Sequence, residues 1–400
     1  MLENKERAAM DSKAPRCKVL VAAVGGGACK VLDRVLADWP DHPPAVAINS
    51  DVRALDELRA EWKLQIGRSV TKGMGAGGDA ELGRMAAEED VDTLRALVAN
   101  CDLMIMLASL GGGTGTGAAP VLAGLAREAG LLTLAYVATP FAFEGERRQE
   151  QAREGLAALK QRADAVVCLP NERLHAMLEP DTPLVEGFAF VDRMMASGVR
   201  GLWTLIARDN VMNLDFSDLQ SLVENSGNEC CHGYGEGAGA ERVEQALDQL
   251  IGGPMLEQGR VIANSGAMIL GVVGGTDLSL AELNRIRQRF QAAARPGAHI
   301  AVGAAVLPEW QGKLALSVLA AEHWMPSAGK ADSGEKKAAS LFADEERPGD
   351  SVRRPRKGNS QQTLSLEGDS GRFKGVKPTI YDGADLDLPT YQRRGTRIPS

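Results

Sequence analysis

Short apolar runs alternate with helical patterns along the first half of the chain. Buried strands are predicted where apolar residues follow one another, at residues 18–24, 45–48, 103–107, 132–137 and 166–169. Apolar residues at helical spacing predict helices at residues 31–36, 118–129 and 147–162. Repeated strand-helix units predict a parallel sheet with helices on both faces, and such a sheet binds its ligand at the carboxyl ends of the strands.

The second half of the chain has a different pattern. Its predicted elements are one long helix, then a strand, a helix and a strand, at residues 183–206, 261–273, 280–294 and 299–306. These elements predict a smaller mixed domain. Residues 230–239 (CCHGYGEGAG) are predicted to form a flexible loop, which either closes over a ligand or is a plain linker. Residues 326–378 are rich in Gly, Ser and charged side chains, so a disordered tether is predicted there.

Five of the seven residues at 111–117 (GGGTGTG) are glycine, and they separate a central strand from the next helix. Glycine removes Cβ atoms that would keep a ligand off the backbone, and a helix start offers unpaired amides and a positive dipole end. Thr114 and Thr116 add hydroxyl donors. The segment therefore predicts a phosphate site, with a tight turn without a ligand as the alternative. No Lys follows as in GxxxxGK[ST], so amides and a metal ion must balance the phosphate charge.

Further glycine segments fall at the same edge of the predicted sheet. Residues 25–27 follow the first strand and lead to Lys30, which either supplies charge to a phosphate or points to solvent. Residues 73–78 (GMGAGG) fit GxGxxG but follow a polar stretch, so they match the dinucleotide motif only weakly. Asp51 follows the second strand, where Asp is a favoured helix cap.

Acidic residues gather just after the long helix, in the pattern NxDxxD formed by Asn213, Asp215 and Asp218. Two carboxylates and an amide on one loop can position a water and a cation. Alternatively, Asp215 caps the next helix and Asp218 is an ordinary acid of its first turn. A helix of about 25 residues rises about 1.5 Å per residue, so Asp215 cannot reach phosphates at the other end of that helix in its own subunit.

Composition narrows the class of protein. The 400 residues are 24% charged and 44% hydrophobic with a formal net charge of -8, which suits a cytosolic two-domain protein and argues against general nucleic-acid binding. Residues 1–16 lack an apolar signal region and no apolar stretch is long enough to cross a bilayer, so we expect the protein in the cytoplasm. The six cysteines include no CxxC pair, so buried reduced thiols are predicted, and Cys29 is the one functional candidate. The His, Cys and acid spacings predict no metal site made by protein ligands alone.

The segments GGGTGTGAAP, PFAFEG, PNERL and NLDFSD closely resemble FtsZ, the family of bacterial tubulin-like division GTPases. The resemblance covers about residues 18–320 and returns near the C-terminus. It implies an α/β fold with a Rossmann-like parallel-sheet GTPase domain of the tubulin/FtsZ type, a long central helix and a smaller α+β C-terminal domain. The family's first nucleotide loop is richer in glycine and asparagine, whereas this chain has Ala28, Cys29 and Lys30.

The resemblance assigns roles around a bound GTP or GDP. It implies that Glu144 binds the ribose hydroxyls, that Arg148 binds the nucleotide and that Asn171 reaches the base. Phe188 stacks on guanine, and Asp192 accepts its N1 and N2 donors, a pair that adenine lacks. Without the resemblance, Phe188 is a core aromatic and Arg148 an exposed helix charge. The residues predicted to contact the nucleotide are Gly25, Gly26, Gly27, Ala28, Cys29, Lys30, Asn49, Asp51, Ala76, Gly77, Gly78, Gly112, Gly113, Thr114, Gly115, Thr116, Gly117, Glu144, Arg148, Asn171, Phe188 and Asp192.

The resemblance also implies head-to-tail stacking, in which the acidic loop of one subunit enters the nucleotide site of the next. Asp215, Asp218 and Asn213 would then catalyse hydrolysis of GTP to GDP and phosphate, with Mg²⁺ neutralising charge, and turnover would depend on assembly. The predicted parts are a disordered tail at 1–16, a GTP-binding domain at 17–182, the central helix at 183–208, a GTPase-activating domain at 209–325, a disordered linker at 326–378 and a partner-binding peptide at 379–400.

The last segment, from Asp385 to Arg394, is similar to the FtsZ terminal peptide that docks on division adaptors and regulators, although Tyr391 and Gln392 replace the usual Phe-Leu. The expected partners are copies of the same chain and such adaptors, with membrane contact only through adaptors, at the division site. Two alternatives stay open. One is a dinucleotide-dependent oxidoreductase, although this chain lacks the GxGxxG after a strand that such enzymes carry. The other is a non-catalytic FtsZ-like scaffold, which the altered first loop favours.

Overall fold

The computed structural model describes residues 17–323 apart from 38, 40, 176, 177, 180, 208 and 209, together with residues 380–381 and 384–385. The chain forms two units, residues 1–331 and 332–400. In the second unit, β11 (Ile380–Tyr381) pairs antiparallel with β12 (Ala384–Asp385). The expected tail, the expected tether and most of the terminal peptide lie outside the described residues. No helix in the described part of the chain is long and apolar enough to cross a membrane.

The first unit contains one ten-stranded sheet in the order β3-β2-β1-β4-β5-β6-β7-β10-β8-β9. Its first six strands along the chain are β1 (Val19–Val24), β2 (Ala45–Asn49), β3 (Trp62–Gln65), β4 (Leu103–Ser109), β5 (Leu132–Thr139) and β6 (Ala165–Pro170). All neighbouring pairs among these six strands are parallel. Continuous apolar runs form them because both faces of the sheet are covered. The five predicted strands are confirmed, whereas β3 was not predicted because this edge strand is polar and partly exposed.

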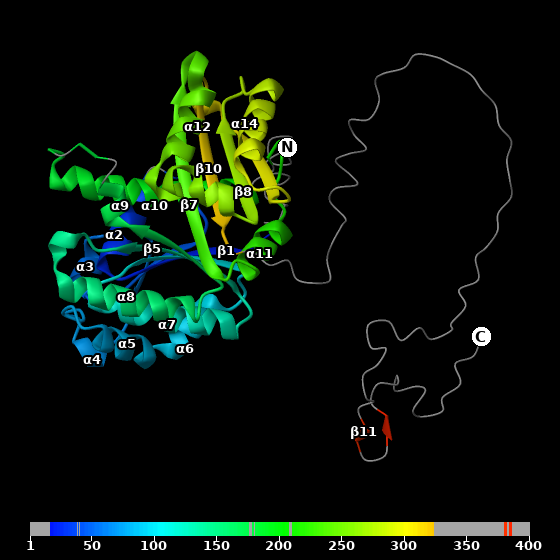
Figure 1. Cartoon of the computed structure of the whole chain (residues 1–400). Coiled ribbons are helices and arrows are strands. Elements are labelled where there is room, and N and C mark those ends of the chain that lie inside the picture. The colour runs from blue at the N-terminus through cyan, green and yellow to red at the C-terminus, as the bar shows by residue number, and fades with distance from the viewer. Residues whose placement is uncertain are drawn as a thin grey trace, which may run out of the picture. The chain divides into compact units, whose positions relative to one another are not determined.

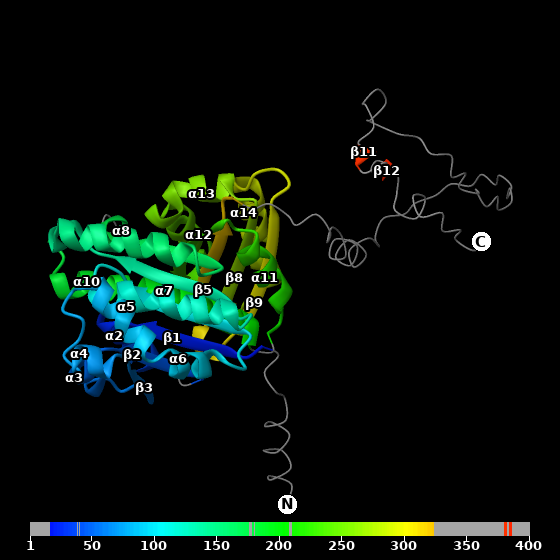
Figure 2. The same ribbon diagram turned by 90° about the horizontal axis from the view of Figure 1, so that it is seen from below.

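Helices cover the two faces of this parallel half (Figures 1 and 2). On one face, α2 (Gly26–Ala37) and α10 (Leu184–Ala207) share a core with the strands. The other face is covered by α5 (Ala80–Glu89), α6 (Val91–Val98), α7 (Gly113–Glu128) and α8 (Glu146–Lys160), the helices nearest the viewer in Figure 2. The connections hold α3 (Val52–Asp56), α4 (Arg68–Thr71), η1 (Ala142–Glu144) and α9 (Asn171–His175). The predicted α/β architecture is therefore confirmed.

The second half of the unit follows α10. Its elements are α11 (Phe216–Glu224), β7 (Asn228–Ala238), η2 (Gly239–Glu241), α12 (Arg242–Gly252), η3 (Pro254–Gly259), α13 (Arg260–Asn264), β8 (Ala267–Gly274), α14 (Leu280–Ala293), β9 (His299–Val306), η4 (Pro308–Trp310) and β10 (Lys313–Ala321). β7 pairs parallel with β6 and antiparallel with β10, so it joins the two halves. One face of β8 and β10 packs on α12, α13 and α14 (Figure 1).

The prediction of a flexible loop at residues 230–239 is wrong, because these residues form most of β7. The glycines that suggested a loop allow α12 to lie directly on this strand. A Cβ on Gly235 would lie 2.2 Å from the carbonyl oxygen of Ala246, and one on Gly237 would lie 1.9 Å from that of Arg242. Glycine is therefore required here for backbone approach rather than for flexibility.

Three predicted element boundaries also need correction. The helices expected at 31–36 and 118–129 begin earlier, at Gly26 and Gly113, so most of the glycine residues belong to first helical turns. The strand expected at 261–273 begins at Ala267, because α13 occupies its first part. Uncapped glycine-rich helix starts do not differ from loops in apolar periodicity, which explains the first two errors.

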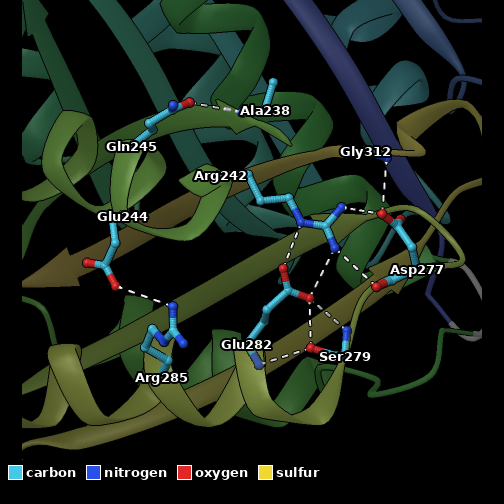
Figure 3. A network of polar contacts seen from close by, with 9 residues as sticks. All are labelled: Ala238, Arg242, Glu244, Gln245, Asp277, Ser279, Glu282, Arg285 and Gly312. Carbon is cyan, nitrogen blue, oxygen red and sulfur yellow. Dashed lines mark hydrogen bonds and ion pairs between the residues drawn. The ribbon is translucent and has the colours of Figure 1, made fainter. Parts of the chain in front are cut away.

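A buried arginine organises the second half (Figure 3). Arg242, 5% exposed, donates to both carboxylate oxygens of Glu282 and to Asp277. Glu282 also forms a capping box with Ser279 at the start of α14. Asp277 accepts from the backbone N–H of Gly312 at 3.2 Å. This network fixes the turn before α14 against α12 and the start of β10.

Candidate functional site

A turn of two glycines connects β4 to an uncapped helix. Gly111 has a φ of +91°, and a Cβ there would lie 2.9 Å from the carbonyl oxygen of Arg148, so this turn needs glycine. Gly112 is the N-cap of α7, and no side chain caps the helix. A Cβ on Gly112 would meet nothing within 4 Å. The open side of this helix start therefore presents the positive end of the α7 dipole to an anion.

The other glycines of this segment serve packing. A Cβ on Gly113 would lie 2.7 Å from the carbonyl oxygen of Asp79, one on Gly115 would lie 2.3 Å from that of Ser109, and one on Gly117 would lie 2.0 Å from that of Ala80. These positions let α7 contact α5 and β4 at backbone distance. Close packing therefore explains Gly113, Gly115 and Gly117, for which the sequence predicts contact with a ligand.

Hydroxyl groups cluster beside the start of α7. Ser50 follows β2, is fully buried, and lies 2.6 Å from Thr114, Oγ to Oγ1. Thr116 Oγ1 accepts from the backbone N–H of Gly111 at 2.9 Å. Asp51 accepts from the first amides of α3, which confirms the helix-cap alternative for this residue. Sequence reasoning did not select Ser50, although a polar residue directly after a buried strand at the ligand edge was a usable signal.

The segment at residues 73–78 folds against these same elements. Met74 forms an isolated β-bridge with Asp51, and a Cβ on Gly113 would lie 2.7 Å from the Cβ of Ala76. Gly77 and Gly78 have φ values of +56° and +79° and open space around them. The structure therefore brings Ala76 and its neighbouring glycines beside the start of α7, as expected for parts of one site.

The first glycine segment differs from expectation. Because α2 begins at Gly26, Ala28 and Cys29 are buried within its first turns and Lys30 lies exposed on its surface. The Cys29 thiol donates to the carbonyls of Ala23 and Ile48, and burial raises its pKa to about 12. A thiol of that kind stays protonated and unreactive. Cys29 is therefore a packing residue, and the functional alternative for it is not supported.

Aromatic rings and two buried hydrogen-bond acceptors lie at the N-terminal end of α10. The Phe141 ring stacks on Phe143 at a centroid distance of 5.0 Å and meets Phe188 edge to face at 5.2 Å. Asn171 Oδ1 is buried without a hydrogen-bond partner, and the Asp192 carboxylate is buried with the Arg34 guanidinium as its ion-pair partner. Buried acceptors without donors are rare and costly. This region therefore suits a planar ligand that brings N–H donors.

Glu144 and Arg148 pair with each other across one turn at 2.7 Å. Glu144 also accepts from the backbone N–H of Phe141 at 3.0 Å, so its carboxylate is held at the start of α8. The start of α8 lies beside the Gly111 turn, since a Cβ on Gly111 would lie 2.9 Å from the carbonyl oxygen of Arg148. The pair thus connects the Gly111 turn with Phe141 of the aromatic group.

The acidic loop lies at the opposite end of α10 from Phe188 and Asn171. Met212 pairs with Ala304 of β9 through two backbone hydrogen bonds of 3.1 and 2.9 Å, and Leu214 is buried. Asp215 occupies the N-cap position of α11 but makes no side-chain cap hydrogen bond. The cap alternative for Asp215 is therefore not supported, and its carboxylate is exposed. Asn213 Oδ1 accepts from the backbone N–H of Asn210 at 2.8 Å.

Asp218 lies in the first turn of α11, as predicted. Burial raises its pKa above the ordinary value and the nearby Asp215 carboxylate adds to this, while the field of His299 lowers it. A raised pKa on a half-buried carboxylate beside an exposed one is typical of functional sites. Within the part of the chain that the structure describes, no group of three or more His, Cys, Asp or Glu could hold a metal ion. A cation here would need ligands from elsewhere.

The structure thus gathers the predicted nucleotide residues at one edge of the sheet and leaves Asn213, Asp215 and Asp218 apart from them. α10, whose 24 residues span about 36 Å, carries Phe188 and Asp192 in its first half and ends shortly before the acidic loop. The fold has glycine-opened helix starts at the carboxyl ends of parallel strands, and one long helix joins them to the mixed half of the same sheet. These features define a tubulin-like nucleotide-binding protein.

Comparison with known families agrees with this class. Residues 18–179 match the Tubulin/FtsZ family, GTPase domain, and residues 229–323 match the FtsZ family, C-terminal domain. The chain belongs to the Tubulin/FtsZ family, and it carries the GTPase domain of that guanine-nucleotide-binding family.

Solved structures resemble this chain over most of its length. The empty FtsZ dimer of M. jannaschii is 29% identical with a TM-score of 0.73, covering 84% of this chain and 98% of its own. A tryptophan-to-tyrosine mutant of M. jannaschii FtsZ is 31% identical with a TM-score of 0.72, covering 80% and 95%. CetZ2 from Haloferax volcanii, in a GTPγS-bound protofilament, shares the fold at 23% identity and a TM-score of 0.61, covering 76% and 92%.

Proposed function

We propose that this protein is a division protein of the FtsZ kind, which polymerises head to tail when GTP is bound and hydrolyses that GTP between subunits. One observation carries the proposal. The acidic loop follows the C-terminal end of α10, a helix of 24 residues that is about 36 Å long, whereas Phe188 and Asp192 of the nucleotide group lie in the half of the helix at its other end. Because α10 belongs to the continuous core, this separation cannot close within one subunit.

Apolar side chains at both ends of the molecule support such stacking. Met74 and Phe143 near the glycine edge are 75% and 64% exposed. Val211 in the acidic loop and Leu280 at the start of α14 are 73% and 80% exposed. Two different apolar surfaces at opposite ends suit a heterologous interface, which repeats without closing and gives a filament.

In the hydrolysis step, the Asp215 and Asp218 carboxylates of one subunit orient a water against the γ-phosphate held by its neighbour. The water oxygen bonds to phosphorus, the bond from phosphorus to the bridging oxygen breaks, GDP leaves and a carboxylate takes the proton. Asn213 is tied to the loop backbone and keeps its shape. Mg²⁺ would be held mainly by the phosphates, with the hydroxyls of Ser50 and Thr114 close by, and would neutralise phosphate charge.

Base recognition rests on buried acceptors. Guanine offers its N1 and N2 donors to the Asp192 carboxylate, Asn171 Oδ1 is a further buried acceptor without a partner, and Phe188 offers a ring for stacking. The terminal peptide from Asp385 to Arg394 is proposed to bind membrane adaptors and regulators at the division site in the cytoplasm. Its similarity to the family's terminal peptide is the support for that part.

The test is GTP turnover against protein concentration with Mg²⁺, with light scattering followed in the same sample. We expect specific activity to rise with scattering, and Asp215→Ala and Asp218→Ala to bind GTP and assemble while losing turnover by about 100-fold or more. Glu224→Ala, an exposed acid at the far end of α11, is the matched control and should behave as the wild type. Full turnover in the two aspartate variants would refute the mechanism, and GTP binding with scattering but no wild-type turnover would favour the scaffold.

A second experiment tests directly whether hydrolysis occurs between subunits. Asp215→Ala has an intact nucleotide site, and a variant with an altered glycine turn, Gly112→Val, has an intact acidic loop. Mixing two variants that are inactive alone should restore activity at about one quarter of the interfaces, because only one pairing joins both intact halves. A mixture that stays inactive although both variants assemble would contradict the shared site.

A further inference from the structure

Arg34 makes an ion pair with Asp192 that joins α2 to α10. This pair lies at the proposed base pocket, the region of Asn171, Phe188 and Asp192. Arg34 lies on α2, which starts at the glycine segment after β1, and Asp192 lies on α10. The guanidinium Nη1 contacts Asp192 Oδ2. The Asp192 side chain is 15% exposed and the Arg34 side chain is 52% exposed. The carboxylate is therefore buried, while the cation that pairs with it reaches solvent.

We propose that Arg34 is a positioning residue for base recognition, which keeps the Asp192 carboxylate charged and aimed into the base pocket and so sets the preference for guanine. This inference rests on the proposed function, since it assumes that guanine occupies the pocket. Sequence reasoning passed over Arg34, because nothing in its helical spacing distinguishes it from a solvated arginine.

The electrostatic reason lies in the burial of Asp192. Burial raises the pKa of this carboxyl above its ordinary value, and the Arg34 and Arg193 guanidiniums lower it against that effect. In the described part of the chain these are the charges acting on Asp192, one from α2 and one from α10. Arg193 lies over the Phe190 ring at 5.7 Å and is exposed, so it acts from a distance. Arg34 touches the carboxylate and has the larger influence.

Charge on Asp192 decides which base fits. An ionised carboxylate has only acceptors and can take both the N1–H and N2–H donors of guanine, whereas a protonated one spends an oxygen as a donor. Apart from the ion pair, Asp192 Oδ2 has no hydrogen-bond partner. Its remaining lone pairs are therefore available to a base. Removing the Arg34 charge should let burial protonate Asp192 nearer to neutral pH.

The experiment measures Kd for GTP and for inosine triphosphate, which lacks the N2 donor, between pH 5.5 and 8.5 under non-assembling dilution. Arg34→Met keeps the stem and removes the charge, and Arg34→Lys keeps the charge. In the wild type we expect a preference for GTP of about ten- to a hundredfold across the range. In Arg34→Met, Kd for GTP should rise about tenfold per pH unit below the raised pKa, with recovery at high pH. Arg34→Lys should follow the wild type.

Arg193→Met is the control for a general field effect and should shift the profile less. The inference is overturned if Arg34→Met gives a profile parallel to the wild type, if Arg34→Lys fails like Arg34→Met, or if Arg193→Met has an equal effect. Each of these outcomes leaves the proposed GTPase standing as long as the wild type binds GTP. A wild type without any preference for GTP over inosine triphosphate overturns the inference alone, and a wild type that does not bind GTP overturns both. Because Arg34 is half exposed, Arg34→Met is expected to keep the wild-type unfolding temperature.

Discussion

Replacing Glu282 by glutamine tests whether the buried Arg242 network stabilises the second half of the protein (Figure 3). Glu282 receives 2.7 and 3.0 Å hydrogen bonds from Arg242 and caps α14 together with Ser279. Glutamine keeps the size and one acceptor but removes the charge. Arg242 would then depend on Asp277, which accepts from Nη1 at 2.6 Å.

The size of the effect follows from the pKa of Glu282. Hydrogen bonds from Arg242 and then from Ser279 outweigh burial and lower this pKa from 4.5 to about 2. At about 1.4 kcal/mol per unit of pKa, the ionised form gains about 3 kcal/mol in the folded state. The side chain is 20% exposed and Arg242 retains Asp277. We therefore expect Glu282→Gln to lower the free energy of unfolding by about 2–3 kcal/mol.

The pH dependence has a definite sign. The folded-state pKa lies below the unfolded one, so the stabilisation is complete above about pH 4.5 and is lost as the pH falls towards about 2. Denaturant unfolding at pH 7 should show the full difference from the wild type, and the difference should narrow below pH 4.5. Glu244→Gln is the control, since the Glu244 side chain is 46% exposed and its carboxylate lies 3.8 Å from the Arg285 guanidinium. A difference below about 0.5 kcal/mol, or one equal to that of the control, would refute the reasoning.

Two more outcomes follow from the site. Gly117→Ala places a Cβ 2.0 Å from the carbonyl oxygen of Ala80 and should lower the free energy of unfolding by about 3 kcal/mol or more. Gly112→Ala meets open space and should fold normally by circular dichroism. Equal stability of the two variants would be inconsistent with the packing explanation. Burial raises the pKa of Asp218, so turnover should fall on the acid side at a higher pH than it would for an ordinary aspartate. Because His299 lowers this pKa, His299→Ala should move the acid limb of the pH profile to higher pH. An unmoved acid limb would exclude Asp218 from the hydrolysis step.

Local sequence signals predicted the parallel half of the fold because its causes are local. A buried strand followed by glycines and a helix is visible in residues 103–128, and the run at 132–137 needs no distant information. The sequence failed at β7, where the glycines are explained by the backbone of α12, which follows it along the chain. The same holds for α7, since Gly113 and Gly117 pack on α5, which precedes them. A glycine required by another element cannot be distinguished from a flexible one by its neighbours in sequence.

The candidate site divides in the same way. Motif residues such as Thr114 and Asp218 could be selected because their position after a strand or at a helix start already indicates chemistry. Ser50 carried a usable signal in its position after a buried strand, but its contact with the buried hydroxyl of Thr114, more than 60 positions away, is not visible in the sequence. Arg34 could not be selected, because its importance comes from the buried carboxylate of Asp192, more than 150 positions away. Such pairings arise from the topology rather than from local pattern.

The central helix connects these observations. α10 packs so closely that a Cβ on Gly198 would lie 2.4 Å from the Tyr136 ring of β5 and one on Gly201 would lie 3.1 Å from Ser317 Oγ of β10. The helix is thus fixed to strands of both halves of the sheet, and its two ends cannot move independently. Asp192 near one end is tied to α2, while the acidic loop beyond the other end is tied to β9. In the proposed mechanism this rigid spacer makes a neighbouring subunit a requirement for hydrolysis, since no local rearrangement of one chain can bring the base-recognition residues and the proposed catalytic acids together.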